Sequence, residues 1–388
     1  MSQLVCSNCK AVYQAEGERC PRCNAQGDQV YSYGRSDEYL QQESERIVRQ
    51  RKETGLEGLV GDLAAVTINV EPERLRPAVQ ELLATTGLRH GQGYETNSGA
   101  LHALEAPDGA DFLVRSRTDD NPFRQHNLHP KSEHLPNTRL ETFIFETKNL
   151  QRYHDIQQQR GVTFLSDTPQ ETDAYRYIQT PPSKYTGNAL GFIEWKHGQR
   201  DFTPADGEPI EWQPGKPDSS YLDNIGRLDH TATRVTAGQR DQAILEFLEL
   251  TNYHFDFAIY VKQFNSITNV ARLSSDAFAM VFTSGIAPYK DDETSGPTER
   301  FIHNYGRRVH HMAFHTENIQ DTFAALKEDG MEYLIELVGS PDEGLRQTFT
   351  TPSEHTLLVN EYIHRYGDFD GFFTRSNVTR LTEATTKQ

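Results

Sequence analysis

The chain has 388 residues, of which 36% are hydrophobic, and its formal net charge is −17. This length allows two domains or a little more, and the apolar fraction is sufficient for a buried core, which excludes a disordered chain. The acidic balance disfavours nucleic acid as the main partner, because phosphate binding needs clustered Lys and Arg.

The N-terminal residues show no targeting segment. Residues 1–6 lack the charged and apolar regions of a signal peptide, and no later apolar run approaches the roughly 20 residues of a membrane span. We therefore expect a cytoplasmic protein without a membrane partner.

All four cysteines lie in the first 23 residues and form two Cys-x2-Cys pairs, namely Cys6, Cys9, Cys20 and Cys23. Four thiolates in this pattern are typical of structural zinc, so residues 1–35 are predicted to form a zinc ribbon folded by its metal. Rubredoxin-like iron is the alternative, and two disulfides conflict with a reducing compartment. The segment has four basic and three acidic residues, so a protein partner is favoured over nucleic acid.

Composition divides the rest of the chain. Residues 36–60 are polar and charged and indicate a solvated helix or linker. Residues 61–202 are globular in composition and form the N-terminal half. Residues 203–222 are rich in Pro, Gly and Asp and indicate a linker, and residues 223–388 form the C-terminal half.

The two halves repeat one pattern. Each contains two copies of a strand and a helix followed by about three strands. Helices are predicted at 75–84, 153–159, 241–250 and 322–328, and Gly161 and Gly330 are expected to cap two of them. The predicted fold class is α+β, in which tandem βαβββ units form two open-barrel halves that curl around cavities.

Three residues of the C-terminal half form a candidate metal site. His230 and His311 fall at equivalent positions on the first strands of two units, and Glu361 falls on a last strand. Strand alternation directs all three toward the cavity and directs His310 and Asp229 outward. Two imidazoles and one carboxylate can hold iron(II) and leave positions open for substrate and dioxygen. The competing interpretation is hydrogen-bonded core histidines.

The N-terminal half lacks this trio. Ala65 and Thr142 stand where the other half has its two histidines, and the sequence alignment places Glu194 opposite Glu361. The N-terminal half is therefore expected to keep the architecture without the metal, as a structural wall or a dimer surface. His303, His315, His355 and His364 have no matching partners and are expected at the surface.

Residues 228–230, 309–314, 360–365 and 371–377 together resemble the 4-hydroxyphenylpyruvate dioxygenase family of the vicinal oxygen chelate superfamily. The resemblance covers about 61–385 and leaves the cysteine segment outside. It implies vicinal-oxygen-chelate modules, iron(II) held by His230, His311 and Glu361, and a 2-oxo acid that chelates the iron. Oxidative decarboxylation and hydroxylation with dioxygen, within aromatic amino acid metabolism, would follow. It also implies that Phe372, on a C-terminal helix, stacks on a substrate ring; core packing is the alternative.

Several positions depart from the family pattern and concern the substrate more than the metal. Residues 295–301 lack the family's glutamine stretch, residues 281–286 lack its asparagine, and Phe373 replaces a glycine. Hydroxylation of a side chain instead of a ring stays open. So do an extradiol-type or other oxygenase that needs no 2-oxo acid, and a non-catalytic metal-bearing protein whose ribbon recruits a partner.

Overall fold

The computed structural model describes residues 3–6, 12–14, 30–33, 35–367, 369 and 371–388. Three short strands, β1 (Gln3–Cys6), β2 (Val12–Gln14) and β3 (Val30–Tyr33), form an antiparallel sheet at the N-terminus. Of the predicted zinc ligands, Cys9, Cys20 and Cys23 lie outside the described residues, and Cys6 is described only as part of β1. The polar segment that follows is helical in α1 (Arg35–Thr54).

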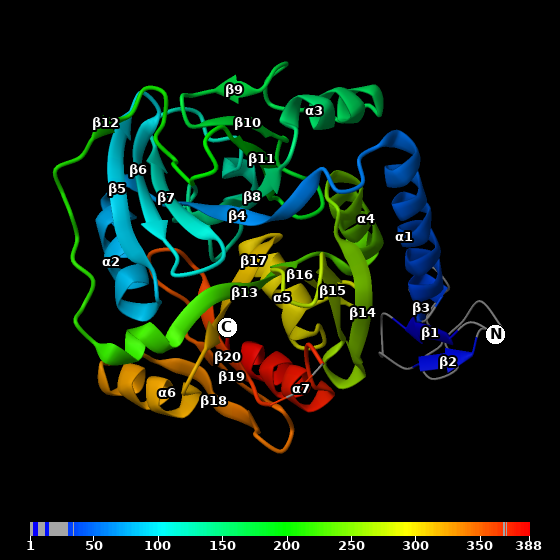
Figure 1. The fold of residues 1–388 in the computed structure, drawn as a ribbon. Coiled ribbons are helices and arrows are strands. Elements are labelled where there is room, and N and C mark those ends of the chain that lie inside the picture. Colours follow the sequence, from blue (N-terminus) through cyan, green and yellow to red (C-terminus); the bar gives the residue numbers. More distant parts are fainter. Residues whose placement is uncertain (1–2, 7–11, 15–29, 34, 368, 370) are drawn as a thin grey trace.

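Each half of the body contains one curled mixed sheet (Figure 1). The N-terminal sheet has the order β12-β5-β6-β7-β4-β8-β11-β10-β9, and the C-terminal sheet has the order β14-β15-β16-β13-β17-β20-β19-β18. The strands of the first are β4 (Val60–Asn69), β5 (Arg89–Thr96), β6 (Gly99–Glu105), β7 (Asp111–Arg117), β8 (Arg139–Thr147), β9 (Gln170–Glu171), β10 (Tyr175–Gln179), β11 (Ala189–Trp195) and β12 (Glu208–Pro209). Those of the second are β13 (Ile225–Arg234), β14 (His254–Val261), β15 (Ser266–Arg272), β16 (Ala279–Gly285), β17 (Arg308–Thr316), β18 (Tyr333–Ser340), β19 (Leu345–Thr350) and β20 (Val359–Arg365).

The strand order confirms the predicted tandem βαβββ units. In each half the first strands of the two units pair antiparallel at the centre of the sheet, as β4 with β8 and β13 with β17. Each first strand also pairs parallel with the last strand of its own unit, as β13 does with β16 and β17 with β20. Equivalent residues of the four units therefore meet at the middle of two curled sheets.

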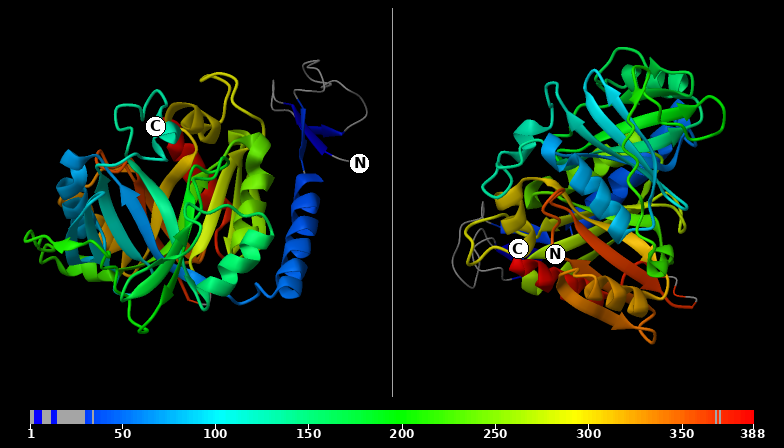
Figure 2. Two further views of the ribbon diagram at one scale, coloured as in Figure 1. Left: turned by 90° about the horizontal axis from the view of Figure 1, so that it is seen from above. Right: turned by 90° about the vertical axis from the view of Figure 1, so that its left-hand side faces the viewer.

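The predicted helices are present as α2 (Leu75–Thr85), α3 (Leu150–Gln159), α4 (Arg240–Leu250) and α6 (Ile319–Glu328). Helix α2 buries Leu75, Val79 and Leu82, because apolar residues three and four apart share one face of a helix. Gly161 and Gly330 follow α3 and α6 with positive φ, as their predicted capping role requires. Two further views show the sheets and helices of both halves (Figure 2). Helices α2 and α4 also contact the other half, because Tyr362 of β20 donates to Thr85 O of α2 and Phe247 of α4 packs against Phe145 of β8.

Two further helices belong to the C-terminal half. Helix α5 (Pro297–Tyr305) was not predicted and lies between the two units of that half. Helix α7 (Arg375–Ala384) packs against both β14 and β18, which are the two edges of the C-terminal sheet. It therefore closes the open side of that half-barrel.

The pairing of β13 with β17 has three register irregularities, and two of them are bulges beside the histidines. Leu228 and His230 face Phe314 and Ala313, so Asp229 is an extra residue on β13. Ala232 pairs with His311 and Thr233 pairs with Val309, so His310 is an extra residue on β17. The pairing of β4 with β8 has matching irregularities. A bulge interrupts alternation, so neighbours of the two histidines need not point away from the cavity.

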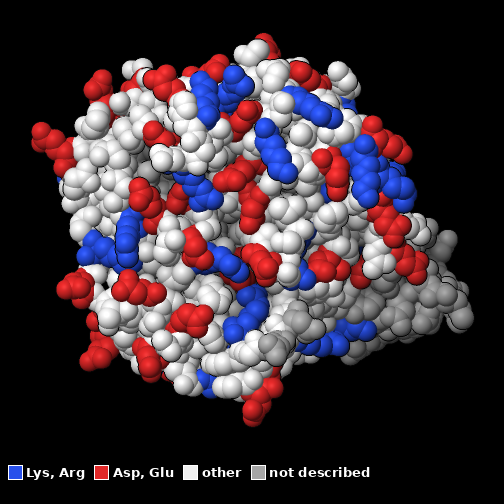
Figure 3. Space-filling model, viewed as in Figure 1, with Lys and Arg blue, Asp and Glu red and all other residues white. Residues whose placement is uncertain are grey.

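The surface carries charges of both signs. On the face drawn in Figure 3 the acidic and basic side chains are interspersed. No helix within the described part of the chain is long and apolar enough to cross a membrane.

Candidate metal centre

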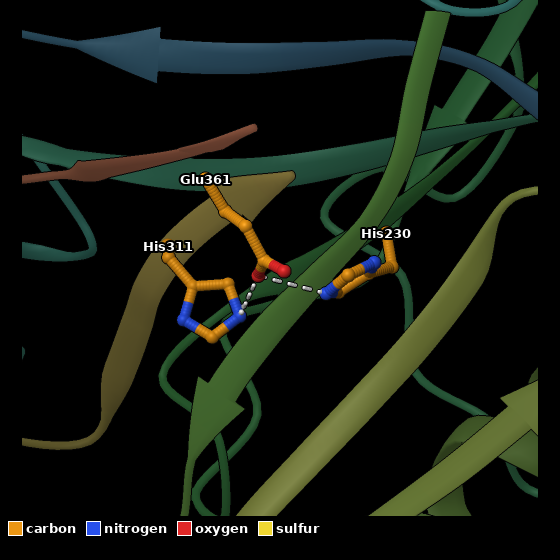
Figure 4. A group of neighbouring side chains, drawn as sticks. All are labelled: His230, His311 and Glu361. Carbon is orange, nitrogen blue, oxygen red and sulfur yellow. Dashed lines mark ion pairs between the residues drawn. The ribbon is translucent and has the colours of Figure 1, made fainter. Parts of the chain in front are cut away.

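The structure brings His230, His311 and Glu361 together at the centre of the C-terminal sheet. Glu361 Oε2 lies 3.2 Å from His230 Nε2 and 3.3 Å from His311 Nε2, and the three side chains point toward one another (Figure 4). They come from β13, β17 and β20. All three are buried, and His230 Nε2 has no hydrogen-bond partner. An ion bound between this nitrogen and Glu361 Oε2 would satisfy both atoms.

The separations suit one transition-metal ion. Nitrogen and oxygen ligands lie about 2.1 Å from such an ion, so adjacent ligands of one ion are about 3 Å apart. The donor atoms of the trio all lie within 4.8 Å of one another, and the donor set is that of a facial triad. A second group, His315, Glu317 and His364, also lies within this limit, but it is partly exposed. His315 and His364 are half-buried, with 32% and 15% of their side chains exposed, whereas the sequence predicts surface positions for both.

Asp229 fixes the orientation of His230. Its Oδ1 lies 2.7 Å from His230 Nδ1, and Arg365 donates to both carboxylate oxygens at 2.6 and 3.0 Å. Burial raises the pKa of Asp229, but the Arg365 guanidinium and the His230 ring outweigh burial and hold that pKa well below its usual range. An ionised Asp229 accepts the Nδ1 proton, which leaves the Nε2 lone pair free for a metal. Strand alternation predicts that Asp229 points away from His230. The structure differs because Asp229 is the extra residue of a bulge, which interrupts the alternation.

His310 supports His311 in the same way. Its Nδ1 lies 2.9 Å from His311 Nδ1, and its Nε2 lies 2.8 Å from Gln388 Oε1. If His310 donates from Nε2 to Gln388, its Nδ1 accepts from His311 and frees His311 Nε2. His310 is 1% exposed and lines the cavity. The prediction that it faces outward is wrong, because it is the extra residue of the second bulge.

Glu361 is held through its other oxygen. Gln347 Nε2 donates to Glu361 Oε1 at 2.5 Å, and Asn377 Nδ2 of α7 donates to Gln347 Oε1 at 3.0 Å. Oε2 is therefore the oxygen available to a metal. The chain of hydrogen bonds also ties the closing helix to the carboxylate.

The two histidines differ in their affinity for protons. Burial lowers the pKa of His230, but the carboxylates of Glu361 and Asp229 outweigh burial and raise it to about 9. Burial and the charges of His310, His230 and Arg234 hold the pKa of His311 well below its usual value. Without metal, the trio therefore holds a proton on His230 beside the Glu361 carboxylate.

The register of the N-terminal sheet corrects one alignment. Thr142 pairs with Ala189 as His311 pairs with Val359, so the position that matches Glu361 is Gly191 and not Glu194. Glu194 instead accepts a hydrogen bond from Leu150 N at the start of α3. A Cβ at Gly191 would lie 2.6 Å from the Tyr177 hydroxyl, so the tyrosine occupies that space. All three metal positions are therefore lost in this half.

Phe372 and Phe373 pack against His230, with ring centroids 5.4 and 5.1 Å from it. Phe372 precedes α7, which corrects its expected place on the helix. Arg365 and Arg272 lie over the Phe372 ring at 4.7 and 5.3 Å, and that ring is 6% exposed. Of these two phenylalanines, Phe373 lines the cavity.

A cavity of about 50 Å³ adjoins the trio. His311 and Glu361 form one part of its wall, and α7 covers it with Val378 and Leu381. The remaining wall is rich in hydroxyl groups and includes the guanidinium of Arg234. This volume is far below the few hundred Å³ of a typical ligand pocket, so a molecule of that size would enter only if part of the wall, such as α7, moved.

Sequence reasoning missed the supporting residues Arg365, Gln347 and Arg234. Each lies on a strand that carries a metal ligand or on the strand next to one. Side chains two and four residues apart share one face of a strand, so Arg234, four residues after His230, could have been predicted. The contacts of Gln347 and Arg365 depend on strand register, which the sequence does not specify.

Comparison with solved structures supports the vicinal oxygen chelate fold. A triple mutant of 4-hydroxymandelate synthase from Streptomyces coelicolor aligns with a TM-score of 0.65 at 16% identity, covering 85% of this chain and 99% of that one. A xylose isomerase-like TIM barrel/4-hydroxyphenylpyruvate dioxygenase fusion protein aligns with a TM-score of 0.60 at 14% identity, covering 90% of this chain and 58% of that one. No protein-family model and no curated protein matches the sequence. The chain has the tandem fold of these structures, as its repeats predict.

Proposed function

We propose that the chain is an iron(II)-dependent dioxygenase that oxidatively decarboxylates a 2-oxo acid and hydroxylates the product. One observation supports this most: three donor atoms of a facial triad converge, while the other polar atom of each side chain is already hydrogen-bonded. His230 Nε2, His311 Nε2 and Glu361 Oε2 would hold the iron. A core of satisfied histidines would leave no such set of free donors.

Bound iron would supply a shared site at which the 2-oxo acid and dioxygen meet. The atoms balance without another reductant, because loss of CO2 provides two electrons and the hydroxylated C–H bond provides two. One oxygen atom enters the new carboxylate and the other enters the new hydroxyl. The chain orients the ligands through Asp229, His310 and Gln347, and it excludes water with Phe373 and α7.

The proposal also includes the identity of the 2-oxo acid. The two structural neighbours are named for 4-hydroxymandelate and for 4-hydroxyphenylpyruvate, so an aryl 2-oxo acid is the first candidate. Phe372 would stack on its ring only after moving, because the two arginines now cover that face. An extradiol-type oxygenase that uses no 2-oxo acid is the competing function.

The decisive experiment adds 4-hydroxyphenylpyruvate and other aryl 2-oxo acids to the anaerobic iron(II) protein. Chelation is expected to give a weak visible charge-transfer band, and admission of air is expected to release one CO2 for each O2 consumed. Oxygen uptake without CO2 would favour the extradiol alternative. Absence of a band with every aryl 2-oxo acid would eliminate the aryl form of the proposal.

Iron affinity is expected to rise with pH. Metal binding needs the unprotonated Nε2 of His230, whose pKa is about 9, so binding releases one proton below that pH. The affinity should therefore increase about tenfold per pH unit from pH 6 to pH 8 and become constant above about pH 9. Anaerobic competition with a chelator measures this slope. A constant affinity across the range would show that His230 is not a ligand.

We also propose structural zinc at Cys6, Cys9, Cys20 and Cys23, with a protein partner for that segment. The purified protein should then contain one zinc in addition to one iron. Replacing Cys20 by serine should remove the zinc and leave iron content and turnover unchanged, because the two sites share no residue. Parallel loss of both metals in this variant would contradict independent sites.

A further inference from the structure

Arg234 is a buried cation beside the metal centre. It lies on β13, four residues after His230, and is 4% exposed. Its Nη1 donates to Pro297 O at 3.2 Å, and its guanidinium lies 4.4 Å from the centre of the Phe301 ring. Among the described residues no carboxylate lies within ion-pair distance of Arg234. Of those that line the cavity, it is the only Lys or Arg.

An unpaired buried charge is costly for a folded protein. Burial lowers the pKa of Arg234 to about 9, and no neighbouring carboxylate offsets this effect. The side chain still carries its charge at neutral pH. One carbonyl and one ring satisfy only a small part of its five N–H donors, so the structure retains a cation without an anion to balance it.

Hydroxyl groups line the same cavity, and those of Ser266 and Thr298 are hydrogen-bonded to each other at 3.3 Å. Thr283 pairs with Arg234 on the adjacent strand β16, and its buried Oγ1 has no hydrogen-bond partner. Thr268 pairs with Thr283 from β15 and lines the cavity, as do Ser266 and Thr298. A guanidinium without an anionic partner and a hydroxyl without a hydrogen-bond partner form a ready site for an oxyanion.

The metal-free half has no arginine at the strand position that matches Arg234. Asn69 pairs with Arg139 as Arg234 pairs with Arg308, so Asn69 occupies the place of Arg234. Its amide nitrogen donates to Asn137 O, at 2.7 Å. In the metal-free half, Arg115 of the neighbouring strand β7 lines the cavity instead, with the Glu141 carboxylate on the same wall. An arginine without a nearby carboxylate in the cavity wall therefore occurs in the half that has the histidines, and we connect it with what the cavity binds there.

We propose that Arg234 and Thr283 bind a second carboxylate of the substrate, which is thus a 2-oxo acid with an anionic group at its far end. This inference rests on the proposed function. The Cα atoms of His230 and Arg234 are separated by four strand residues, roughly 13 Å, and Arg234 lines the same cavity as His311 and Glu361. A substrate with a short chain or a single ring between its two acid groups fits the distance between the metal site and Arg234 if α7 moves to enlarge the cavity.

Matched pairs of 2-oxo acids test the proposal. Anaerobic iron(II) protein is titrated with 2-oxoadipate and 2-oxohexanoate, and with 4-carboxyphenylpyruvate and phenylpyruvate, while the chelate band is recorded. Each diacid is expected to bind on the order of 10- to 100-fold more tightly than its partner, as a hydrogen-bonded charge pair allows. Arg234→Met should remove this preference and change the affinity of the monoacids little. Arg89→Met, at an exposed site, serves as the control for loss of charge.

The outcomes separate this inference from the function on which it rests. A band with phenylpyruvate but no diacid preference overturns the inference and leaves the dioxygenase proposal standing. A preference that survives in Arg234→Met also overturns it. No band with any of the four acids removes the proposed function itself. Thr283→Val provides a milder variant, in which the preference should fall several-fold.

A second readout distinguishes binding from a structural role. In the absence of ligand, Arg234→Met should raise the melting temperature, because it replaces an uncompensated buried charge with an apolar side chain of similar length. The 2-oxo diacid should raise the melting temperature of the wild type more than that of the variant, whereas the matching monoacid should raise both equally. A lower melting temperature in the variant, together with an unchanged diacid preference, would assign Arg234 to the fold alone.

Discussion

Replacing Glu361 by alanine is expected to abolish stable iron binding and to reduce turnover by more than about a hundredfold. Loss of an outer-shell partner alone costs about 10- to 100-fold in metal affinity, so loss of a ligand should cost more. Glu361 Oε2 is the atom that lies near both imidazole nitrogens, at 3.2 and 3.3 Å. Without it, two histidines remain and cannot form the triad. Iron content after anaerobic loading and oxygen uptake measure the effect.

The chain contains a matched control for this variant. Glu194 occupies the place of Glu361 in the sequence alignment but bonds to Leu150 N in the structure. Glu194→Ala should therefore cost about 1 kcal/mol of stability, as loss of a helix-start contact does, and keep full iron content. Equal iron loss in the two variants would contradict the assignment of the metal to the C-terminal half, and stoichiometric iron in Glu361→Ala would exclude this ligand.

The fold could be predicted because its signal is repeated. Each unit shows the same order of strand and helix, and Gly161 and Gly330 mark two helix ends with the positive φ that favours glycine. The pattern of each unit is weak alone, but four units with the same order of strands and helix support one another. His230 and His311 could be identified for the same reason, since both occupy equivalent first strands.

The errors have one physical origin, which is the register between strands. Alternation predicts facing only along an uninterrupted strand, so the bulges at Asp229 and His310 reversed both predictions. Glu194 was matched to Glu361 by residue type, whereas the hydrogen-bonded register matches Gly191. Gln347 and Arg365 escaped notice because their partners lie 14 and 136 positions away in the chain.

Replacing Asp229 by alanine is expected to destabilise the protein by about 3 kcal/mol and to weaken iron binding by about 10- to 100-fold. Asp229 is 6% exposed and is the carboxylate that binds both Arg365 and His230. Its removal leaves the Arg365 guanidinium, one-fifth exposed, without its anion, and it releases the His230 ring from its fixed tautomer. The estimate takes the lower end of the range for buried pairs because water reaches Arg365.

The pH dependence of unfolding and a double mutant separate these two effects. The pKa of Asp229 is depressed in the folded protein, so its contribution to stability is present above the unfolded pKa of about 4 and is lost as pH falls below it. Asp229→Ala should therefore lose less stability than the wild type on acidification. Adding Arg365→Met should restore most of the stability, because no charge is left unpaired, but should not restore iron affinity, because His230 still lacks its acceptor. Denaturant titrations and anaerobic iron binding measure the two quantities, and recovery of both in the double mutant would show that Asp229 acts on His230 only through Arg365.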